Sequence, residues 1–384
     1  MSPHPVTKTV GSFERKAPRM SAIVRAMEEV GPDVAEIARR TKEPAESVRY
    51  ILKTKIFGKG LGVYAIYNAY ALGLTKRALI ADLAAPYSER TWDLFNAMEE
   101  KWFLTYSFRM IPEGTYAMIF DVPDGREEDF TELIQRMQEV GFIKKVHDDL
   151  GFEWRRNNEM RAELFDFKRS EWDFDWTKLP VRPAPPIPVA KKIEEIHLAD
   201  LGLMAELWVD SARSLAELAK PNEMSVRSAV RHMRHVKEKG FSTGYRVNWM
   251  KSQKLNTSGR YLTSPHKYLV TGVFVRGITQ QEQRKVRDAL NRLPFLWVEA
   301  GGNNYFAELI VPLALTNETI QFIHREFTGL SHKTRFYILD WGSGMSSSTP
   351  RHLFDPKRQQ WVYEPESQVR DLEAAMAKVA TVPK

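Results

Sequence analysis

Cationic and hydroxyl side chains recur along one face of the segment Val226–Lys239. Its arginines stand three or four residues apart, which is the spacing of one helix face. A guanidinium can pair with two acceptors on guanine or with a phosphate. We therefore predict that this face binds double-stranded DNA. Base readout is assigned to Arg227, Ser228, Arg231, His232, Arg234 and His235, and phosphate contacts to Lys237, Lys239, Arg246 and Lys251.

A second, weaker face of the same kind lies in the first half of the chain, on Ala45–Thr54. The glycine-rich segment GKGLG follows it and could form a wing beside the helix. The two faces carry different side chains, so they should not prefer identical half-sites, and whether the first contacts DNA stays open. The candidate contacts here are Ser47, Arg49, Tyr50, Lys53, Lys55 and Lys59.

The charge of the chain is concentrated around the first of these faces. Residues 213–254 hold ten Lys/Arg and three Asp/Glu, a net of +7, and the whole chain has the same formal net charge of +7. A local basic surplus on a nearly neutral body is typical of a nucleic-acid binder. A solvated basic face is the alternative interpretation.

The composition excludes several classes of site. The 384 residues include no cysteine, which rules out disulfides, thiolate zinc sites, iron–sulfur clusters and cysteine nucleophiles. The phosphate-loop, dinucleotide, nucleophile-elbow and zinc-protease motifs are missing too. Asp121 and Asp124 could be imagined as a carboxylate pair, but surface acids explain them better. We therefore predict no enzyme, no catalytic residue and no cofactor.

Metal and membrane sites are also not expected. His232 and His235 stand three residues apart and could suit a metal, but the sequence places no carboxylate or third ligand beside them. The apolar runs, such as Tyr268–Val275, are too short to cross a bilayer. The first ten residues lack the apolar core of a signal peptide. These observations predict a soluble, cytoplasmic protein without a bound metal.

The sequence repeats itself. LFDFKRSEW at Leu164–Trp172 returns as LFDPKRQQW at Leu353–Trp361, and GTYAMIFDVP returns as NNYFAELIVP, ending at Pro123 and Pro312. Both offsets are 189 residues. We interpret the chain as a tandem duplication. The repeated LFDxKRxxW segment should dock its Leu, Phe and Trp onto its own domain, with a basic–aromatic contact to DNA or protein as the alternative.

Each half should open with a helical trio that positions the basic face. In the second half, Ser214 with Glu217 three residues later predicts a capping box, and Ser225 predicts the N-cap of the basic helix. The apolar stripe of that helix is expected to be Val226, Ala229, Val230, Met233 and Val236. Each trio is followed by a β-α-β-β-α-β pattern. The fold class is therefore α+β, with two modules of a winged helix-turn-helix and a ferredoxin-like domain.

The expected boundaries follow from these patterns and from a proline-rich stretch between the halves. They are a flexible tail at 1–16, a winged helix-turn-helix at 17–70, a ferredoxin-like domain with a C-terminal extension at 71–178, a linker at 179–192, a second winged helix-turn-helix at 193–256, a second ferredoxin-like domain with its extension at 257–363, and a tail at 364–384.

This arrangement resembles the Lrp/AsnC, or feast/famine, transcription regulators. The second half is the closer match, through DLGLMAELWVDSARSLAELAKPNEMSVRSAVRHMRHVKEKGFSTGYRVN. The resemblance implies that the ferredoxin-like domains dimerise and that the heads bind pseudo-palindromic DNA. One chain would then be a fused dimer, and two chains would form a homo-oligomer. It also implies a small-molecule effector near the loop Gly301, Gly302, Asn303 and Asn304, although a hairpin turn is the preferred interpretation of that loop.

Two alternatives to a sequence-specific regulator remain. Siroheme decarboxylases resemble Lrp-like proteins and bind a tetrapyrrole with histidine and arginine, so a chain of two modules could mimic their paired subunits. An architectural protein would use the same phosphate contacts without reading bases. The retained basic helix favours the regulator over the decarboxylase.

Overall fold

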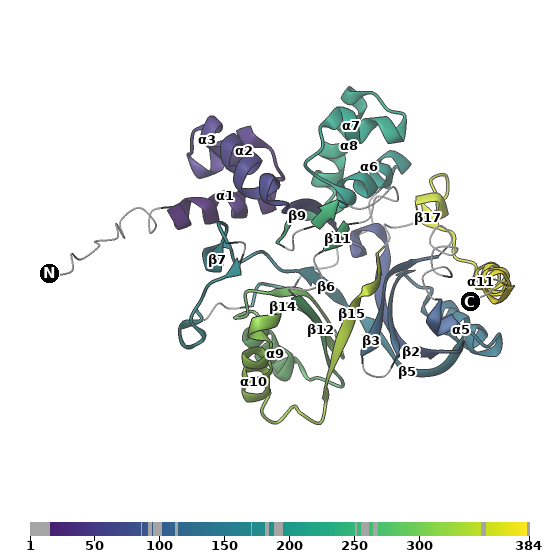
Figure 1. The fold of residues 1–384 in the computed structure, drawn as a ribbon. Helices are drawn as coiled ribbons and strands as arrows, with labels where there is room; N and C mark the ends of the chain where they lie inside the picture. Colours follow the sequence, from purple (N-terminus) through teal and green to yellow (C-terminus); the bar gives the residue numbers. More distant parts are fainter. Residues whose placement is uncertain are drawn as a thin grey trace.

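The computed structural model describes residues 16–85, 87–90, 94, 102–111, 114–169, 171–180, 184–187, 195–249, 252–254, 261–263, 268–346 and 351–381. It confirms the expected fold class: two modules follow each other, each a helix-turn-helix trio and a ferredoxin-like β-sheet layer (Figure 1). Among these residues, no helix is both long and apolar enough to span a membrane.

The two helical trios lie side by side above the sheet (Figure 1). The N-caps predicted for the second trio are confirmed. The Ser214 and Glu217 side chains cap each other's backbone N–H, and the Ser225 hydroxyl accepts from Ser228 N at 3.1 Å. The trios comprise α1 (Lys16–Val30), α2 (Val34–Thr41) and α3 (Ala45–Ile51), and α6 (Leu198–Val209), α7 (Leu215–Ala219) and α8 (Val226–Glu238).

The strands of both modules join one nine-stranded sheet, in the order β5-β2-β4-β3-β15-β12-β14-β13-β6. The modules meet where β3 pairs with β15 in antiparallel register, and Arg109 forms a 2.6 Å ion pair with Asp340 across this seam. The contact expected between two subunits is thus made within one chain. The strands are β2 (Leu74–Leu83), β3 (Leu104–Ile111), β4 (Tyr116–Pro123), β5 (Ile143–Phe152), β6 (Trp154–Asn157), β12 (Tyr268–Val275), β13 (Leu296–Gly301), β14 (Tyr305–Pro312) and β15 (Thr334–Ser346).

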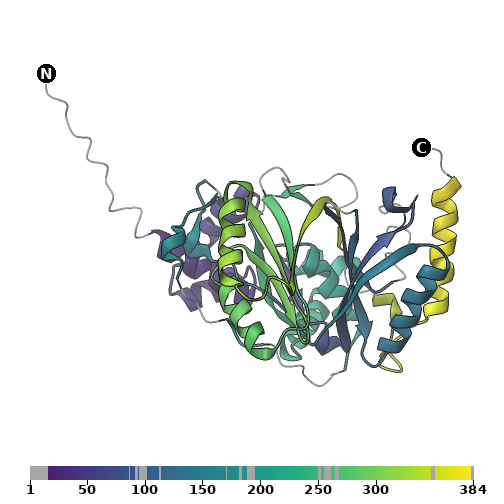
Figure 2. The ribbon, with the colours of Figure 1, turned by 90° about the horizontal axis from the view of Figure 1, so that it is seen from below.

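One segment joins the two edges of this sheet. β5 lies at one edge and β6 at the other, yet only Glu153 separates them in the sequence. The sheet must therefore curve back on itself. In Figure 2 its two halves face each other as inner layers, with α9 (Gln280–Leu290) and α10 (Thr316–Glu326) outside one half and α5 (Glu127–Glu139) and α11 (Pro365–Thr381) outside the other. The first helix of the β-α-β-β-α-β pattern in the first module, which the sequence predicts at residues 88–101, lies mostly outside the described residues.

The wings of the two trios pair with each other. β1 (Gly62–Tyr67) runs antiparallel to β9 (Ser242–Asn248), with Tyr64 opposite Arg246. This two-stranded ribbon ties the trios together. It also brings side chains of both modules over the inner side of the sheet.

The repeated LFDxKRxxW segments form two small hairpins, β7–β8 (Phe165–Asp166, Glu171–Trp172) and β16–β17 (Phe354–Asp355, Gln360–Trp361). Their aromatic residues are docked as expected, but partly onto the opposite module. The Trp172 ring lies 5.3 Å from that of Trp249, and Trp361 Nε1 donates to Leu72 O at 2.7 Å. Each hairpin therefore packs against the other module and connects the two modules.

The C-terminal segment differs from expectation. Residues 364–384 were predicted to be a tail, but α11 is a helix whose apolar face is buried against the first module beside α5. Leu372 has no exposed surface, and Val369, Ala375 and Met376 are buried with it. Their spacing of three or four residues is the signal of an amphipathic helix.

Candidate functional site

The predicted DNA-binding helix α8 presents a cationic face to solvent. Arg227, Arg231, Arg234 and Lys237 are all exposed. The helix is rotated relative to the predicted stripe, because Val226 and Val230 are 48% and 41% exposed while Ala229 and Val236 are buried. The cationic face therefore includes two valines.

The rotation turns the two histidines of α8 inward, which corrects their assignment to base readout. The Nδ1 atoms of His232 and His235 lie 2.8 and 2.9 Å from the two carboxylate oxygens of Asp200 on α6. Asp200 has no exposed surface. The sequence did not predict the contact between these histidines and Asp200, because an acidic residue is common in the first turn of a helix. Ser228 and Lys239 are partly exposed.

One of the predicted phosphate contacts, Arg246, does not lie on this face. Arg246 is only 1% exposed, because its place in the β1–β9 ribbon points it inward, where its guanidinium lies 3.3 Å above the centre of the Trp297 ring. It cannot reach a phosphate on the surface. Lys251 lies outside the described residues.

The first trio offers a less cationic surface. Arg49 is exposed but forms an ion pair with Glu46, and Tyr50 is 58% exposed with Lys53 exposed beside it. The wing begins later than expected, because residues 52–59 form helical turns and β1 starts only at Gly62, the last residue of GKGLG. Ser47, Lys55 and Lys59 are partly buried.

The loop expected to bind an effector is a packed hairpin turn between β13 and β14. Gly302 O accepts from Gln283 Nε2 at 3.1 Å, and Asn303 O accepts from Ile278 N at 3.0 Å. A Cβ atom on Gly301 would lie 2.5 Å from the Trp154 ring, so the glycine is required by close packing. An effector role for Gly301, Gly302, Asn303 and Asn304 stays a prediction.

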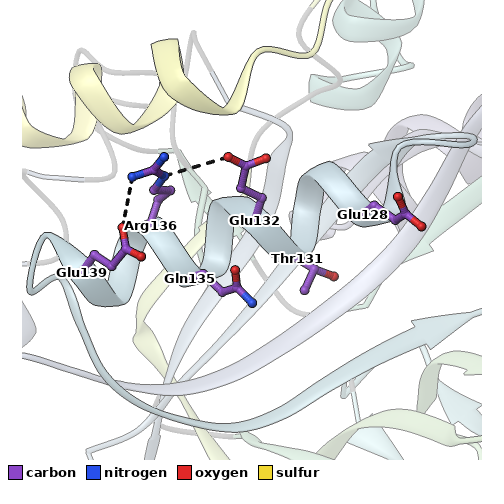
Figure 3. A pocket seen from close by; sticks show the side chains of 6 residues that line it. All are labelled: Glu128, Thr131, Glu132, Gln135, Arg136 and Glu139. Carbon is purple, nitrogen blue, oxygen red and sulfur yellow. Dashed lines mark hydrogen bonds and ion pairs between the residues drawn. The ribbon is translucent and has the colours of Figure 1, made fainter.

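A hollow of about 520 Å³ lies on the outer face of α5 (Figure 3). Its lining side chains are all exposed, and Arg136 forms ion pairs with Glu132 and Glu139 of the same helix. Such pairs belong to a solvated helix face. The hollow brings no side chains together for chemistry.

The side chains most suited to chemistry lie inside the curved sheet, below the ribbon. Lys76 on β2 pairs with Asp121 on β4, its direct cross-strand neighbour, and the two are 1% and 0% exposed. Tyr67 at the end of β1 donates to Asp121 Oδ2 at 2.9 Å and accepts from Lys76 Nζ at 3.2 Å. Burial lowers the pKa of Lys76 to about 8, although Asp121 acts in the opposite direction. Asp121 is thus not the surface acid that the sequence indicated.

A cavity of about 340 Å³ opens beside this lysine. Exposed Arg25 and Glu29 of α1 stand among its lining residues, while Lys76, Tyr67 and Glu28 are buried. The volume falls in the range of small-molecule sites. Side chains of α1, the ribbon, the sheet and the proline-rich linker line it: Arg25, Glu28, Glu29, Ile66, Tyr67, Asn68, Ala69, Tyr70, Lys76, Arg155, Arg156, Asn157, Glu159, Pro185, Pro186, Thr243, Gly244 and Tyr245.

Burial raises the pKa of two carboxyl groups at or near the cavity and so favours their neutral form. Burial raises the pKa of Glu28 to about 8, although the N–H groups of Met160 and Val247 donate to it. Burial also raises the pKa of Glu308, on β14, to about 7, with Arg246 and Arg155 opposing the shift. Titratable groups perturbed in this way gather at functional sites more often than elsewhere.

Comparisons with known proteins place this architecture. No protein-family model matches the sequence, and no curated protein matches it. Among solved structures, siroheme decarboxylase NirDL matches 94% of this chain and 99% of its own, with a TM-score of 0.51 and 11% identity. The same values hold for its co-complex with an iron-uroporphyrin III analogue. A Mycobacterium tuberculosis leucine response regulatory protein matches 36% of this chain, with a TM-score of 0.25 and 18% identity.

The chain therefore shares its fold, over 94% of its length, with the solved structure of an enzyme. This contradicts the prediction that the chain is not an enzyme, because the solved structures that match it over that length are those of a decarboxylase. The regulator covers only about a third of the chain. The sequence did not reveal the site because Lys76 and Asp121 lie on different, largely apolar strands, LTKRALIADL and YAMIFDVP, and nothing along the chain shows that the two residues are neighbours. The available signal was Asp121, which is the one charged residue of YAMIFDVP.

Proposed function

We propose that the chain is an enzyme that decarboxylates a carboxylate-rich tetrapyrrole held in the cavity beside Lys76. The observation that carries this proposal is the buried Lys76, with its lowered pKa, at a cavity that Arg155 and Arg156 also line. Cations in a site of low dielectric bind carboxylates strongly. The full-length likeness to a siroheme decarboxylase supports the same class of substrate.

The residues of the cavity have distinct roles in this reaction. The arginines would hold the carboxylates of the substrate and orient it. When the carbon–carboxylate bond breaks, carbon dioxide leaves and the electron pair stays on carbon, delocalised into the conjugated ring, until a proton arrives. With a pKa of about 8, Lys76 is largely protonated at neutral pH and can supply that proton, and solvent then restores it. Tyr67 hydrogen-bonds to both Lys76 and Asp121 and so positions the lysine for this transfer.

The test is a spectroscopic titration followed by product analysis. The purified protein is mixed with siroheme without oxygen, binding is read from the Soret absorption band, and products are identified by mass spectrometry. We expect a shifted band and loss of carboxyl groups as carbon dioxide. Tyr67→Phe should retain binding and lose turnover, and Lys76→Met should lose turnover, while the exposed control Lys144→Met retains both binding and turnover. Absence of any band shift in the parent protein would exclude the tetrapyrrole.

A second candidate function rests on a separate surface. We propose that the exposed face of α8 binds double-stranded DNA through Arg227, Arg231, Arg234 and Lys237. None of these four side chains forms an ion pair with another described residue, so their charges are available to phosphates. In this second proposal, binding of α8 to DNA serves to regulate transcription.

Fluorescence anisotropy on upstream genomic fragments and on a random duplex tests this surface. Arg231→Glu should weaken binding by about 1–3 kcal/mol, whereas Arg136→Glu on the remote helix α5 should leave it unchanged. Equal, steeply salt-dependent binding to every duplex would indicate an architectural protein. Equal binding by parent and Arg231→Glu would remove α8 from the interface.

A further inference from the structure

Three histidines from two helices surround one buried carboxylate at the junction of α6 and α8. Asp200 lies in the first turn of α6, and each of its oxygens lies within 2.9 Å of a histidine Nδ1, from His232 or His235. The ring of His197, the N-cap residue of α6, lies 4.9 Å from that of His235 and 5.7 Å from that of His232. Donor atoms from His197, Asp200 and His235 all lie within 4.8 Å of one another.

The cluster is more than the cap of a helix. The backbone N–H of His197 already donates to Asp200 at 3.1 Å, which satisfies the requirement for a cap. Two imidazoles are added to the same carboxylate, and a third ring stands against them. The side chains are mostly withdrawn from solvent: 12% of His232 and 21% of His235 is exposed, and His197 forms the open side at 42%. Burying this many polar groups costs free energy unless something binds them.

We propose that His197, Asp200, His232 and His235 form a binding site for a divalent transition metal of the zinc type. Imidazole nitrogen and carboxylate oxygen are the donors that zinc accepts in a protein without thiolates. Tetrahedral zinc holds its donors about 3.3 Å apart. The Asp200 oxygens lie 2.8 and 2.9 Å from their histidine partners. His197 and His235 each place a donor atom within 4.8 Å of Asp200 and of each other, and His232 completes the set as the fourth ligand by a side-chain rotation.

Four protein ligands leave no open position for water, so the site is structural. It would fasten the start of α6 to the middle of α8, beside Arg231, whose Nη2 lies 3.4 Å from His232 Nε2. The first trio contains no histidine between residues 16 and 56, so it provides an internal comparison that should not respond to metal. The proposal does not depend on the tetrapyrrole reaction.

The test is zinc binding by the full-length chain after chelation and removal of any purification tag. Isothermal titration with zinc chloride should give a single tight equivalent, and cobalt should give the visible absorption of a tetrahedral site. His197→Ala and His235→Ala should each weaken zinc binding by at least about tenfold, while His332→Ala, an exposed histidine elsewhere, should not. His197 is half-exposed, so its variant should fold.

Two results would overturn the site. One is equal zinc affinity in the parent, His197→Ala and His235→Ala. The other is cobalt absorption without tetrahedral character in the parent. Asp200→Asn adds a third measurement, since asparagine can keep the cap while losing the charge. This variant should fold but lose the rise in melting temperature that zinc gives the parent.

Discussion

The two halves of the nine-stranded sheet carry different side chains at corresponding positions. In the first module, Lys76 on β2 faces Asp121 on β4 as a buried ion pair. The repeated strands align Asp121 with Ile310 of the second module, and the neighbour of Ile310 on β12 is Val270, so the matching pair is aliphatic and also buried. The same pair of strand positions is thus occupied by an ion pair in one module and by two aliphatic side chains in the other. The fold therefore does not require the ion pair, which points to a functional reason for it.

The first helices of the two trios, α1 and α6, also differ in the side chain that they place at a corresponding position. Glu28 on α1 and Val209 on α6 both stand five residues before an N-cap, Asp33 and Ser214 respectively. Glu28 is 5% exposed and receives N–H groups of β9 and of the segment after β6, whereas Val209 is 47% exposed. The corresponding position thus carries a buried carboxyl group in the first module and an exposed apolar side chain in the second.

Removing Lys76 alone should have the largest effect on stability. Lys76→Met leaves Asp121 buried without its partner, which should cost about 3–5 kcal/mol. The double variant Lys76→Val, Asp121→Ile copies the second module and should recover most of that loss. Urea denaturation measures both, and turnover of the tetrapyrrole should stay lost in the double variant. A double variant as unstable as the single one would show that the modules are not interchangeable here.

Glu28 should make stability depend on pH. Its pKa is raised from 4.5 to about 8, so between these values the native protein keeps a proton that the unfolded chain releases. Stability from this group is therefore complete below pH 4.5 and is lost as the pH rises towards 8, by about 1.4 kcal/mol for each pH unit between the two values. Glu28→Gln should show a flatter fall in melting temperature between pH 5 and pH 8. Val209→Gln, the exposed counterpart, should match the parent.

The two hairpin tryptophans should respond differently to the same change. Trp361 Nε1 donates to Leu72 O, whereas the buried Trp172 Nε1 has no hydrogen-bond partner among the described residues. Trp361→Phe should therefore cost about 1 kcal/mol more than Trp172→Phe. Chemical denaturation of the two variants in parallel gives the comparison, and equal losses would contradict the hydrogen bond to Leu72.

The smallest effect concerns the caps of the two third helices. Ser225 caps α8 with its hydroxyl, but Pro44 before α3 makes no side-chain cap. Ser225→Ala should cost about 1 kcal/mol. Pro44→Ser should change stability by less than about 0.5 kcal/mol, because the new cap is offset by the lost rigidity of proline. Thermal melts decide this, and a neutral Ser225→Ala would show that tertiary packing alone holds α8.

Much of the fold was predictable because local patterns agree with it. The capping box at Ser214, the N-cap at Ser225 and the GGNN turn each act within a few residues, and the structure contains all three. The rotation of α8 was not predictable from its own sequence. The apolar spacing of Val226 and Val230 predicts core residues. In the structure they are exposed, because α8 is rotated so that His232 and His235 face Asp200 on another helix.

The sequence by itself determined the duplication, the order of the elements and the cationic face of α8, because periodicity and capping act over a few residues. Only the tertiary structure decided where the polar groups meet. Lys76, Asp121, Glu28 and Glu308 come from four elements in both modules, and each looks isolated along the chain. Their chemistry depends on burial and on distances across strands, which no spacing in the sequence encodes.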